Sequence, residues 1–351
     1  MTIFRVQLIS FFAKLEFSLY NSSRNIMPKG VISRYLNLNR KSYNAIKQRA
    51  YRRLSKCSDR SIGVVCSGGG GVESGAIHSR IRPIWSIDGN PISQVKFNLS
   101  QMCSDFNELN HGNHVIRQTC QKVDINSLQE TNIIWAFLPC DRASNMSNFR
   151  KRVESDLDTL LAQRFVEIFS VLKPNIICVE NVPGWVKFEA FNIILNSLIS
   201  QGYKVDYRNY NFSHYQVPQN RIRLILRACR ENIQINRIAR NPSAGWYDSI
   251  CDLIPHLEVG NINPKIDNYL TKQNVNRNRF ILVENFFNQN KCLYSDEASN
   301  CWTIRAMSGV DHKGNSRNKS IAIWNPDMGN YQCLSSEAIA RLCGFPKSYY
   351  K

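Results

Sequence analysis

The chain has 351 residues and a formal net charge of +18, with hydrophobic residues making up 43% of its composition. A chain of this length can bury a full α/β core, and its basic charge predicts an anionic partner, either a nucleic acid or an acidic membrane surface. No apolar run approaches the roughly 20 residues of a membrane-spanning helix. The twelve cysteines lie at least nine residues apart, which excludes a C-x-x-C zinc pair and favours a reducing compartment.

The basic excess is concentrated at the N-terminus. Residues 1–60 contain 13 Lys and Arg against two acidic residues, a net charge of +11, which leaves +7 for the rest of the chain. Residues 30–53 show two short helical patterns around a polar turn, and the second pattern is rich in Arg and Lys. This arrangement predicts either a DNA-reading helix-turn-helix or a basic helical hairpin that packs on the main domain.

From residue 62 onward, apolar runs alternate with amphipathic segments. We expect buried strands at residues 62–66, 84–87, 133–138, 176–179, 204–210 and 222–226. A long helix is expected between residues 153 and 172, because Pro174 would end it. The alternation predicts an α/β fold with a Rossmann-like, doubly wound, mostly parallel sheet. Beyond about residue 230 the sequence becomes rich in Asn, Ser and Lys, which predicts a second, smaller lobe.

Glycines and acids follow the first predicted strands. Residues 65–75, V-C-S-G-G-G-G-V-E-S-G, lead from a strand into a helix, where glycines allow a ligand to approach and the helix start offers N–H groups. Asp88 ends the next strand, a place where a ribose diol is commonly held. Asp124, in V-D-I, offers a second acid. Taken singly, each of these features is also typical of an ordinary turn or a solvated loop.

Three further segments stand at predicted strand edges. They are L-P-C-D at 138–141, V-E-N-V at 179–182 and Q-N-R-I-R at 219–223. A lone cysteine after a strand is usually a small buried residue. In a parallel sheet, however, these segments would bring a thiol, a carboxylate and two guanidiniums to one rim. That set combines a nucleophile, a proton donor or acceptor and anion-stabilising donors, and is far more specific than any one member.

Taken in order, these motifs resemble those of cytosine-5 DNA methyltransferases. The series runs from C-S-G-G-G-G-V-E-S-G through D-G-N, K-F-N, V-D-I, P-C, E-N-V and Q-N-R-I-R to T-I-R at 303–305 and A-R-L-C-G-F-P at 340–346. The resemblance covers residues 62–346. It implies an S-adenosylmethionine cofactor, no metal, and methyl transfer to C5 of a cytosine flipped out of double-stranded DNA. It also implies a cytoplasmic, nucleoid-associated protein of a bacterial or phage restriction-modification system.

The resemblance assigns roles to individual residues. Cys140 would form a covalent bond to C6 of the cytosine, and Glu180 would stabilise or protonate N3. Arg221 and Arg223 would steady the adduct and a nearby phosphate. The residues implied in cofactor binding are Ser67, Gly68, Gly70, Gly71, Gly75, Asp88, Asp124 and Pro139. The implied domains are a basic extension at 1–60, a catalytic domain at 61–235, a target-recognition lobe at 236–300 and a return to the catalytic domain at 301–351.

The sequence departs from the family pattern at three places. Cys66 stands where the family has an aromatic residue beside the adenine, so weaker cofactor binding is expected. Asp141 replaces a glutamine after Cys140, and its carboxylate opposes thiolate formation while Arg142 favours it. The sequence ends at G-F-P-K-S-Y-Y-K, before the family's Gly-Asn-x-Val-Pro helix. This predicts a truncated product, a second polypeptide that supplies the helix, or a permuted order.

Three functional hypotheses follow from the sequence. The first is a monomeric DNA cytosine-5 methyltransferase. The second is a catalytically impaired or truncated relative that binds DNA through residues 30–53 and regulates rather than methylates. The third keeps the chemistry and changes the substrate to RNA, in particular tRNA.

Overall fold

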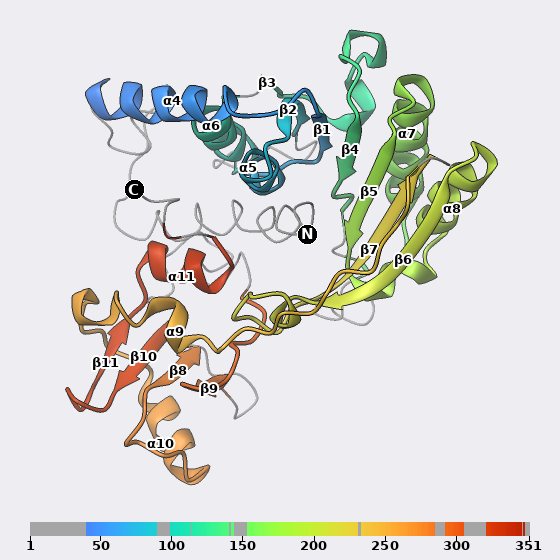
Figure 1. Cartoon of the computed structure of the whole chain (residues 1–351). Helices are drawn as coiled ribbons and strands as arrows, with labels where there is room; N and C mark the ends of the chain where they lie inside the picture. The colour runs from blue at the N-terminus through green and yellow to red at the C-terminus, as the bar shows by residue number, and fades with distance from the viewer. Residues whose placement is uncertain are drawn as a thin grey trace. The chain divides into compact units, whose positions relative to one another are not determined.

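The computed structural model describes residues 40–89, 99–112, 114–139, 142–143, 153–230, 233–284, 292–304, 321–345 and 347. Contacts divide this part of the chain into two compact units, each with its own sheet (Figure 1). The first unit comprises residues 40–210 and 222–239, and the second comprises residues 211–221 and 240–347.

The first unit is built on a seven-stranded sheet with the order β3-β2-β1-β4-β5-β7-β6. Its strands are β1 (Ser61–Val65), β2 (Arg82–Ile87), β3 (His114–Ile116), β4 (Ile133–Ala136), β5 (Ile176–Asn181), β6 (Lys204–Asn211) and β7 (Ile222–Cys229). The strands β3, β2, β1, β4 and β5 pair in parallel, whereas β7 runs antiparallel to β5. The predicted α/β fold with a mostly parallel sheet is therefore confirmed.

Helices cover both faces of this sheet. They are α5 (Gly71–His78), α6 (Leu99–His111), α7 (Asp156–Leu172) and α8 (Glu189–Ser200), and a further helix, α4 (Arg40–Leu54), packs against α6. Successive side chains of a strand point to opposite faces. Ile134 and Ile177 accordingly join the core under α7 and α8, while Ile133 and Trp135 join the core under α5 (Figure 1). The sheet is thus doubly wound, as the sequence predicts.

The six predicted strands correspond to β1, β2, β4, β5, β6 and β7, and the predicted long helix corresponds to α7. At the start of α7 the Ser155 N–H donates to Asp158 Oδ2 at 2.8 Å. At its other end Lys173 adopts a left-handed conformation with φ 47°, directly before Pro174. The positions at which α7 begins and ends therefore follow from its local sequence.

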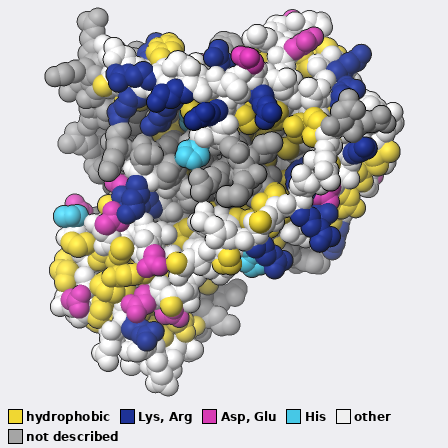
Figure 2. Space-filling view, in the orientation of Figure 1, with side chains coloured by type: hydrophobic (Ala, Val, Ile, Leu, Met, Phe, Trp, Pro, Cys, Tyr) yellow, Lys and Arg dark blue, Asp and Glu magenta, His cyan; other side chains and the backbone are white. Residues whose placement is uncertain are grey.

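The basic helix α4 packs on the first unit through one face. Ala50 is only 1% exposed, and Leu54 lies beside Gly112 at the end of α6. Lys47 and Arg52 are exposed on the remaining surface, and Figure 2 shows Lys and Arg side chains gathered where Figure 1 draws α4. This packing agrees with a basic helix docked on the main domain. Residues 30–39, which would hold the first helix and the turn of a helix-turn-helix, lie outside the described residues.

The second unit contains a four-stranded antiparallel sheet with the order β11-β10-β8-β9. Its elements are α9 (Tyr247–Ile250), α10 (Pro264–Lys272), β8 (Ile281–Glu284), β9 (Tyr294–Asp296), β10 (Ile321–Asn325), β11 (Asn330–Cys333) and α11 (Ser336–Leu342). The segment 301–351, which the resemblance assigns to a return to the catalytic domain, contributes β10, β11 and α11 to this unit. The reason is the antiparallel pairing of β10 with β8.

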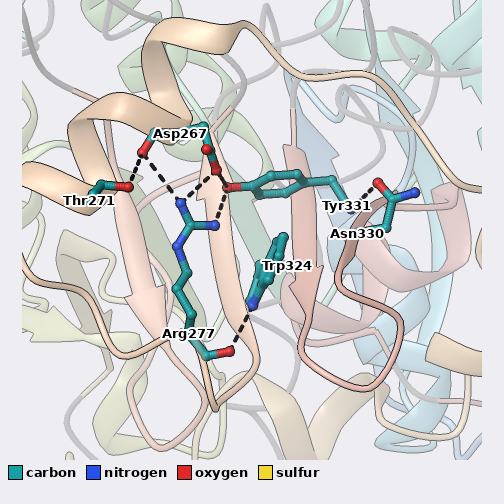
Figure 3. Close-up of polar contacts among 6 residues, drawn as sticks. All are labelled: Asp267, Thr271, Arg277, Trp324, Asn330 and Tyr331. Atoms are coloured by element: carbon teal, nitrogen blue, oxygen red, sulfur yellow. Dashed lines mark hydrogen bonds and ion pairs between the residues drawn. The ribbon is translucent and has the colours of Figure 1, made fainter.

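A polar and aromatic cluster joins α10 to the β10–β11 hairpin in this unit (Figure 3). The guanidinium of Arg277 lies 4.7 Å from the ring centroid of Trp324 and 2.6 Å from Asp267 Oδ1. It also donates to the Tyr331 hydroxyl at 2.7 Å, and this hydroxyl donates to Asp267 Oδ1 at 3.0 Å. Burial raises the pKa of Tyr331 above its usual range. The Tyr331 hydroxyl therefore connects the helix, the loop after it and the hairpin.

Replacing Tyr331 with Phe should destabilise the second unit by about 2 kcal/mol, because two hydrogen bonds to charged groups are removed. Hydrogen exchange of the β10 and β11 amides would report the change within this unit. Tyr294→Phe removes a hydroxyl from an exposed tyrosine of the same sheet and serves as the matched control. Equal protection in both variants would contradict the stabilising role of the cluster.

Candidate active site

The parallel strands of the first unit end at one common edge. The last residues paired across β2, β1, β4 and β5 are Ile87, Val65, Ala136 and Val179. The residues that follow them are Asp88, Cys66, Phe137 and Glu180. Neighbouring strands lie about 4.8 Å apart, so these residues emerge side by side. The strand order changes direction between β1 and β4, and open α/β sheets bind ligands at such switch points.

The turn between β1 and α5 has the backbone of a ligand-binding loop. Gly68 and Gly70 have φ values of 57° and 87°, a region that glycine adopts without strain. Gly70 is the N-cap of α5 and has no side chain to bond the first N–H groups of the helix. Those groups at the start of the helix suit the polar atoms of a ligand. The predicted residues Ser67 and Gly71 lie in the same turn, and Gly75 follows within α5.

The two predicted cofactor acids lie near the neighbouring strands. Asp88 directly follows β2, and its N–H donates to the Ile116 carbonyl at 3.1 Å. Asp124 is exposed and caps the short 3₁₀ helix Ile125–Ser127. A cavity of about 470 Å³ is lined by Trp85, Ile116 and Asp124 among others. Of the predicted cofactor residues that the structure describes, only Asp124 lines this cavity. The cavity therefore does not coincide with the glycine turn.

An ion pair stands at the end of β5. Arg223 Nε lies 2.8 Å from Glu180 Oε1, and the two side chains are 12% and 11% exposed. In the antiparallel register Glu180 faces Ile225, two residues from Arg223, so both charged side chains project from the same face. A buried charge without a partner is costly. The pair therefore holds the Glu180 carboxylate in a fixed place at the rim.

The other two predicted catalytic residues are Arg221 and Cys140. Arg221 belongs to the second unit, where it is fully buried and its N–H donates to Asn211 Oδ1 at 3.1 Å. Pro139 follows β4 and is exposed. Cys140 and Asp141 lie outside the described residues. The roles of Arg221 and Cys140 therefore stay predictions.

The described residues on both sides of Cys140 contact the end of β5 and the residues that follow it. Asn181 Nδ2 donates to the Leu138 carbonyl at 3.3 Å. A Cβ added at Gly184 would lie 2.5 Å from the Ala143 carbonyl oxygen, so the absence of a side chain permits a close approach there. The E-N-V-P-G stretch thus supplies Glu180 and also anchors the segments that flank the predicted nucleophile.

A fully buried carboxyl lies beneath the glycine turn, and the sequence did not reveal it. Glu73, in the first turn of α5, accepts hydrogen bonds through Oε1 from Ser86 Oγ at 2.5 Å and from Asn107 Nδ2 at 3.0 Å. Burial raises the pKa of Glu73 to about 7. In the sequence it looks like an ordinary acid in the first turn of a helix, where acids are common. No sequence signal distinguishes it from a solvated residue.

Residues 64–351 match the model of the family described as C-5 cytosine-specific DNA methylase. The chain belongs to this family. The resemblance recognised from the ordered motifs is therefore confirmed. Within the described residues, no helix is long and apolar enough to cross a membrane, and no group of three potential ligands is placed to hold a metal.

Several known proteins are similar to this chain. It is 27% identical over 196 residues to the type II methylase M.HgiDII of Herpetosiphon aurantiacus, covering 54% of this chain and 52% of that protein. It is 29% identical over 158 residues to the type II methyltransferase M.BsuRI of Bacillus subtilis, covering 41% and 36%. These matches span about half of the relatives' length or less. The solved S. pombe Dnmt2 methyltransferase shares its fold, with a TM-score of 0.51 at 15% identity over 83% of this chain and 88% of that one.

The buried carboxyl of Glu73 should make the stability of this protein depend on pH. The folded pKa of Glu73, about 7, lies above the ordinary value of 4.5, so its favourable contribution is complete below pH 4.5 and is lost as the pH rises through 7. Glu73→Gln does not titrate. Between pH 5 and pH 8, the free energy of unfolding of the variant should gain about 2–3 kcal/mol relative to the wild type. Urea unfolding at both pH values measures this difference, and a constant difference would contradict it.

Proposed function

We propose that this chain is an S-adenosylmethionine-dependent DNA cytosine-5 methyltransferase of the restriction-modification type. The observation that carries the proposal is the position of the Glu180–Arg223 ion pair. It stands on the same rim as the glycine turn and the end of β4, in a chain of the C-5 cytosine-specific DNA methylase family. A fixed carboxyl and guanidinium beside the end of the strand that precedes Cys140 are groups that addition to a pyrimidine ring requires.

The rim at β1 and β2 supports S-adenosylmethionine as the cofactor. The start of α5 offers backbone N–H groups, and its N-cap, Gly70, has no side chain to bond them in place of a ligand. Asp88, at the end of β2, would hold the ribose hydroxyls, and the exposed Asp124 would hold the adenine amino group. This set of donors and acceptors fits the cofactor. When bound, S-adenosylmethionine would supply an electrophilic methyl group.

The proposed chemistry begins with the poor nucleophilicity of C5 in cytosine. The Cys140 thiolate adds to C6, and the new S–C6 bond turns the ring into an enamine-like species with an electron-rich C5. Glu180 is proposed to take up a proton from solvent and to donate it to N3, and Arg223 keeps this carboxyl in place through their 2.8 Å contact. Arg221 is proposed to steady the adduct and a nearby phosphate. Once C5 carries the methyl group, loss of the C5 proton to solvent and elimination of the Cys140 thiolate restore the aromatic ring.

The charge of the first unit supports duplex DNA as the partner. Lys47, Arg52, Arg53 and Lys56 are exposed along and after α4, and residues 40–58 contain no acidic residue. Flipping a base out of a duplex costs a few kcal/mol, and phosphate contacts offset part of this cost. Similar proteins come from Bacillus subtilis and from a Bacillus phage, which supports a bacterial or phage origin and a location beside the nucleoid.

Transfer of tritium from labelled S-adenosylmethionine tests the proposed function. The wild type should label duplex DNA and leave tRNA unlabelled, and Cys140→Ser should abolish labelling. Glu180→Gln should lower the single-turnover rate by about 10²–10⁴-fold, because a positioned proton donor contributes that much. Labelling of tRNA alone would assign the RNA substrate instead. Retained DNA binding without any transfer would overturn the enzymatic proposal in favour of a regulator.

The contribution of α4 to DNA binding is tested by its salt dependence. Replacing Arg52 and Arg53 together with Gln should reduce the slope of log Kd against log salt concentration by about 1 for each phosphate that the variant no longer binds. Lys204→Gln removes one exposed positive charge from β6, at the other edge of the sheet, and should leave the slope unchanged. Fluorescence anisotropy with a short duplex at several salt concentrations measures both slopes. Identical slopes for all three proteins would exclude α4 from the interface.

A further inference from the structure

We propose that Asn107 on α6 is a positioning residue for the cofactor, because its side chain holds the glycine turn in the shape that binds S-adenosylmethionine. The inference rests on the proposed function and adds a residue from outside all the motifs that carry the family resemblance. Asn107 is fully buried. It lies on a helix between β2 and β3, remote in sequence from the turn that it contacts.

The amide group of Asn107 bonds to both ends of the turn. Its Nδ2 donates to Ser67 Oγ at 3.3 Å and to Glu73 Oε1 at 3.0 Å. Ser67 opens the turn after β1, and Glu73 stands in the first turn of α5. One buried NH₂ group therefore fixes the spacing between the end of the strand and the start of the helix.

The middle of the turn rests directly on the same side chain. A Cβ added at Gly70 would lie 2.6 Å from Asn107 Cγ and 2.7 Å from His111 Cε1. These separations are far below van der Waals contact. The backbone of Gly70, with φ 87°, thus lies against Asn107 and His111 with no room for a substituent. The Asn107 amide therefore contacts all three of these positions in the turn: Ser67, Gly70 and Glu73.

His111 fixes the orientation of that amide. Its Nδ1 lies 2.9 Å from Asn107 Oδ1 and 3.1 Å from the Asn107 carbonyl oxygen. Burial lowers the pKa of His111 to about 3, so the ring is neutral at physiological pH. Both neighbours are acceptors, which places the ring proton on Nδ1. A rotated amide would set its oxygen against Glu73 Oε1 and its NH₂ group against the His111 N–H, so one orientation is favoured.

The network also reaches the strand that carries the predicted ribose acid. Glu73 Oε1 accepts a second hydrogen bond from Ser86 Oγ at 2.5 Å, and Ser86 precedes Asp88 by two residues at the end of β2. The glycine turn and the end of β2 would supply the two halves of the cofactor site. A chain of buried hydrogen bonds joins them, and such supported geometry is what a binding site needs.

Asn107→Leu tests the inference, since leucine has a similar size and cannot donate to Ser67 or Glu73. In the cofactor-free protein, hydrogen exchange of the backbone amides of residues 66–72 should accelerate by about tenfold or more. The Kd for labelled S-adenosylmethionine in equilibrium dialysis should rise by about tenfold or more, because small misplacements of a positioning group are costly. The KM for the cofactor should rise in parallel, while kcat at saturating cofactor stays within about threefold.

Asn110→Leu is the matched control on the same helix. The Asn110 amide bonds the Phe106 carbonyl of its own helix at 2.9 Å, so this variant should change neither the exchange rates nor the Kd. Ser67→Ala removes one branch of the network and should give a smaller effect that is not additive with that of Asn107→Leu. Should Asn107→Leu fail to fold, Ser67→Ala and Asn107→Ser carry the same test.

Two results would overturn the inference. One is an unchanged Kd and unchanged exchange at residues 66–72 in the Asn107 variant. The other is a fall in kcat with an unchanged KM. A wild type that binds S-adenosylmethionine and transfers no methyl group would contradict the proposed function alone, and the comparison of Kd values would still decide the role of Asn107. A wild type that binds no cofactor would overturn both.

Discussion

The register between β1 and β2 is the constraint on which the rest of the site depends. It shifts between Ile62 and Gly63, after which Val65 pairs with Ile87. At the shift, a Cβ on Gly63 would overlap the ring of Trp85, so glycine is required for this indole to lie across the strand. A slip of one residue would turn each side chain to the other face of the sheet. The shift is therefore what aligns Asp88 with the start of the glycine turn.

The two buried carboxyls near the rim are stabilised in different ways. Glu180 lies against a guanidinium, so its charge is compensated where the proposed chemistry needs a polar group. Glu73 receives only neutral donors, from a hydroxyl and an amide, and burial raises its pKa to about 7. A guanidinium beneath the glycine turn would require more space. Neutral donors instead give directional contacts within a tightly packed region.

The sequence predicts the central sheet well because its strands are continuous apolar runs, as parallel strands buried on both faces are. It does not predict β3, which has three residues, or the buried side of α6, whose sequence L-S-Q-M-C-S-D-F-N-E-L-N-H mixes polar and apolar residues. Asn107 is buried through partners far away in sequence, and periodicity does not show such partners. The pairing of β10 with β8 is equally non-local.

In the candidate site, too, the sequence predicts local features and does not predict non-local partners. The motifs predict Glu180 and Arg223 at one rim of a parallel sheet, whereas in the structure the two side chains meet through the antiparallel pairing of β5 with β7. Motif order does not separate Arg221 from Arg223, which are two residues apart and belong to different units. The roles of Cys140 and the cofactor residues stay predictions. Local motifs identify the groups that the chemistry needs, whereas the three-dimensional partners determine which groups meet.

Because Cys66 stands at this position, the proposed cofactor binding in this chain depends strongly on the buried network under the glycine turn. An aromatic ring at this position would bury about 150–250 Å² against a ligand, and a cysteine offers far less contact area. Cys66 is only partly buried and adopts φ 58° at the start of the turn, a conformation that non-glycine residues adopt with strain. With less apolar contact available, cofactor affinity would depend more on backbone N–H groups and on their exact placement. The hydrogen bonds of Asn107 to Ser67 and Glu73, together with its packing against Gly70, are the means by which this fold maintains that placement.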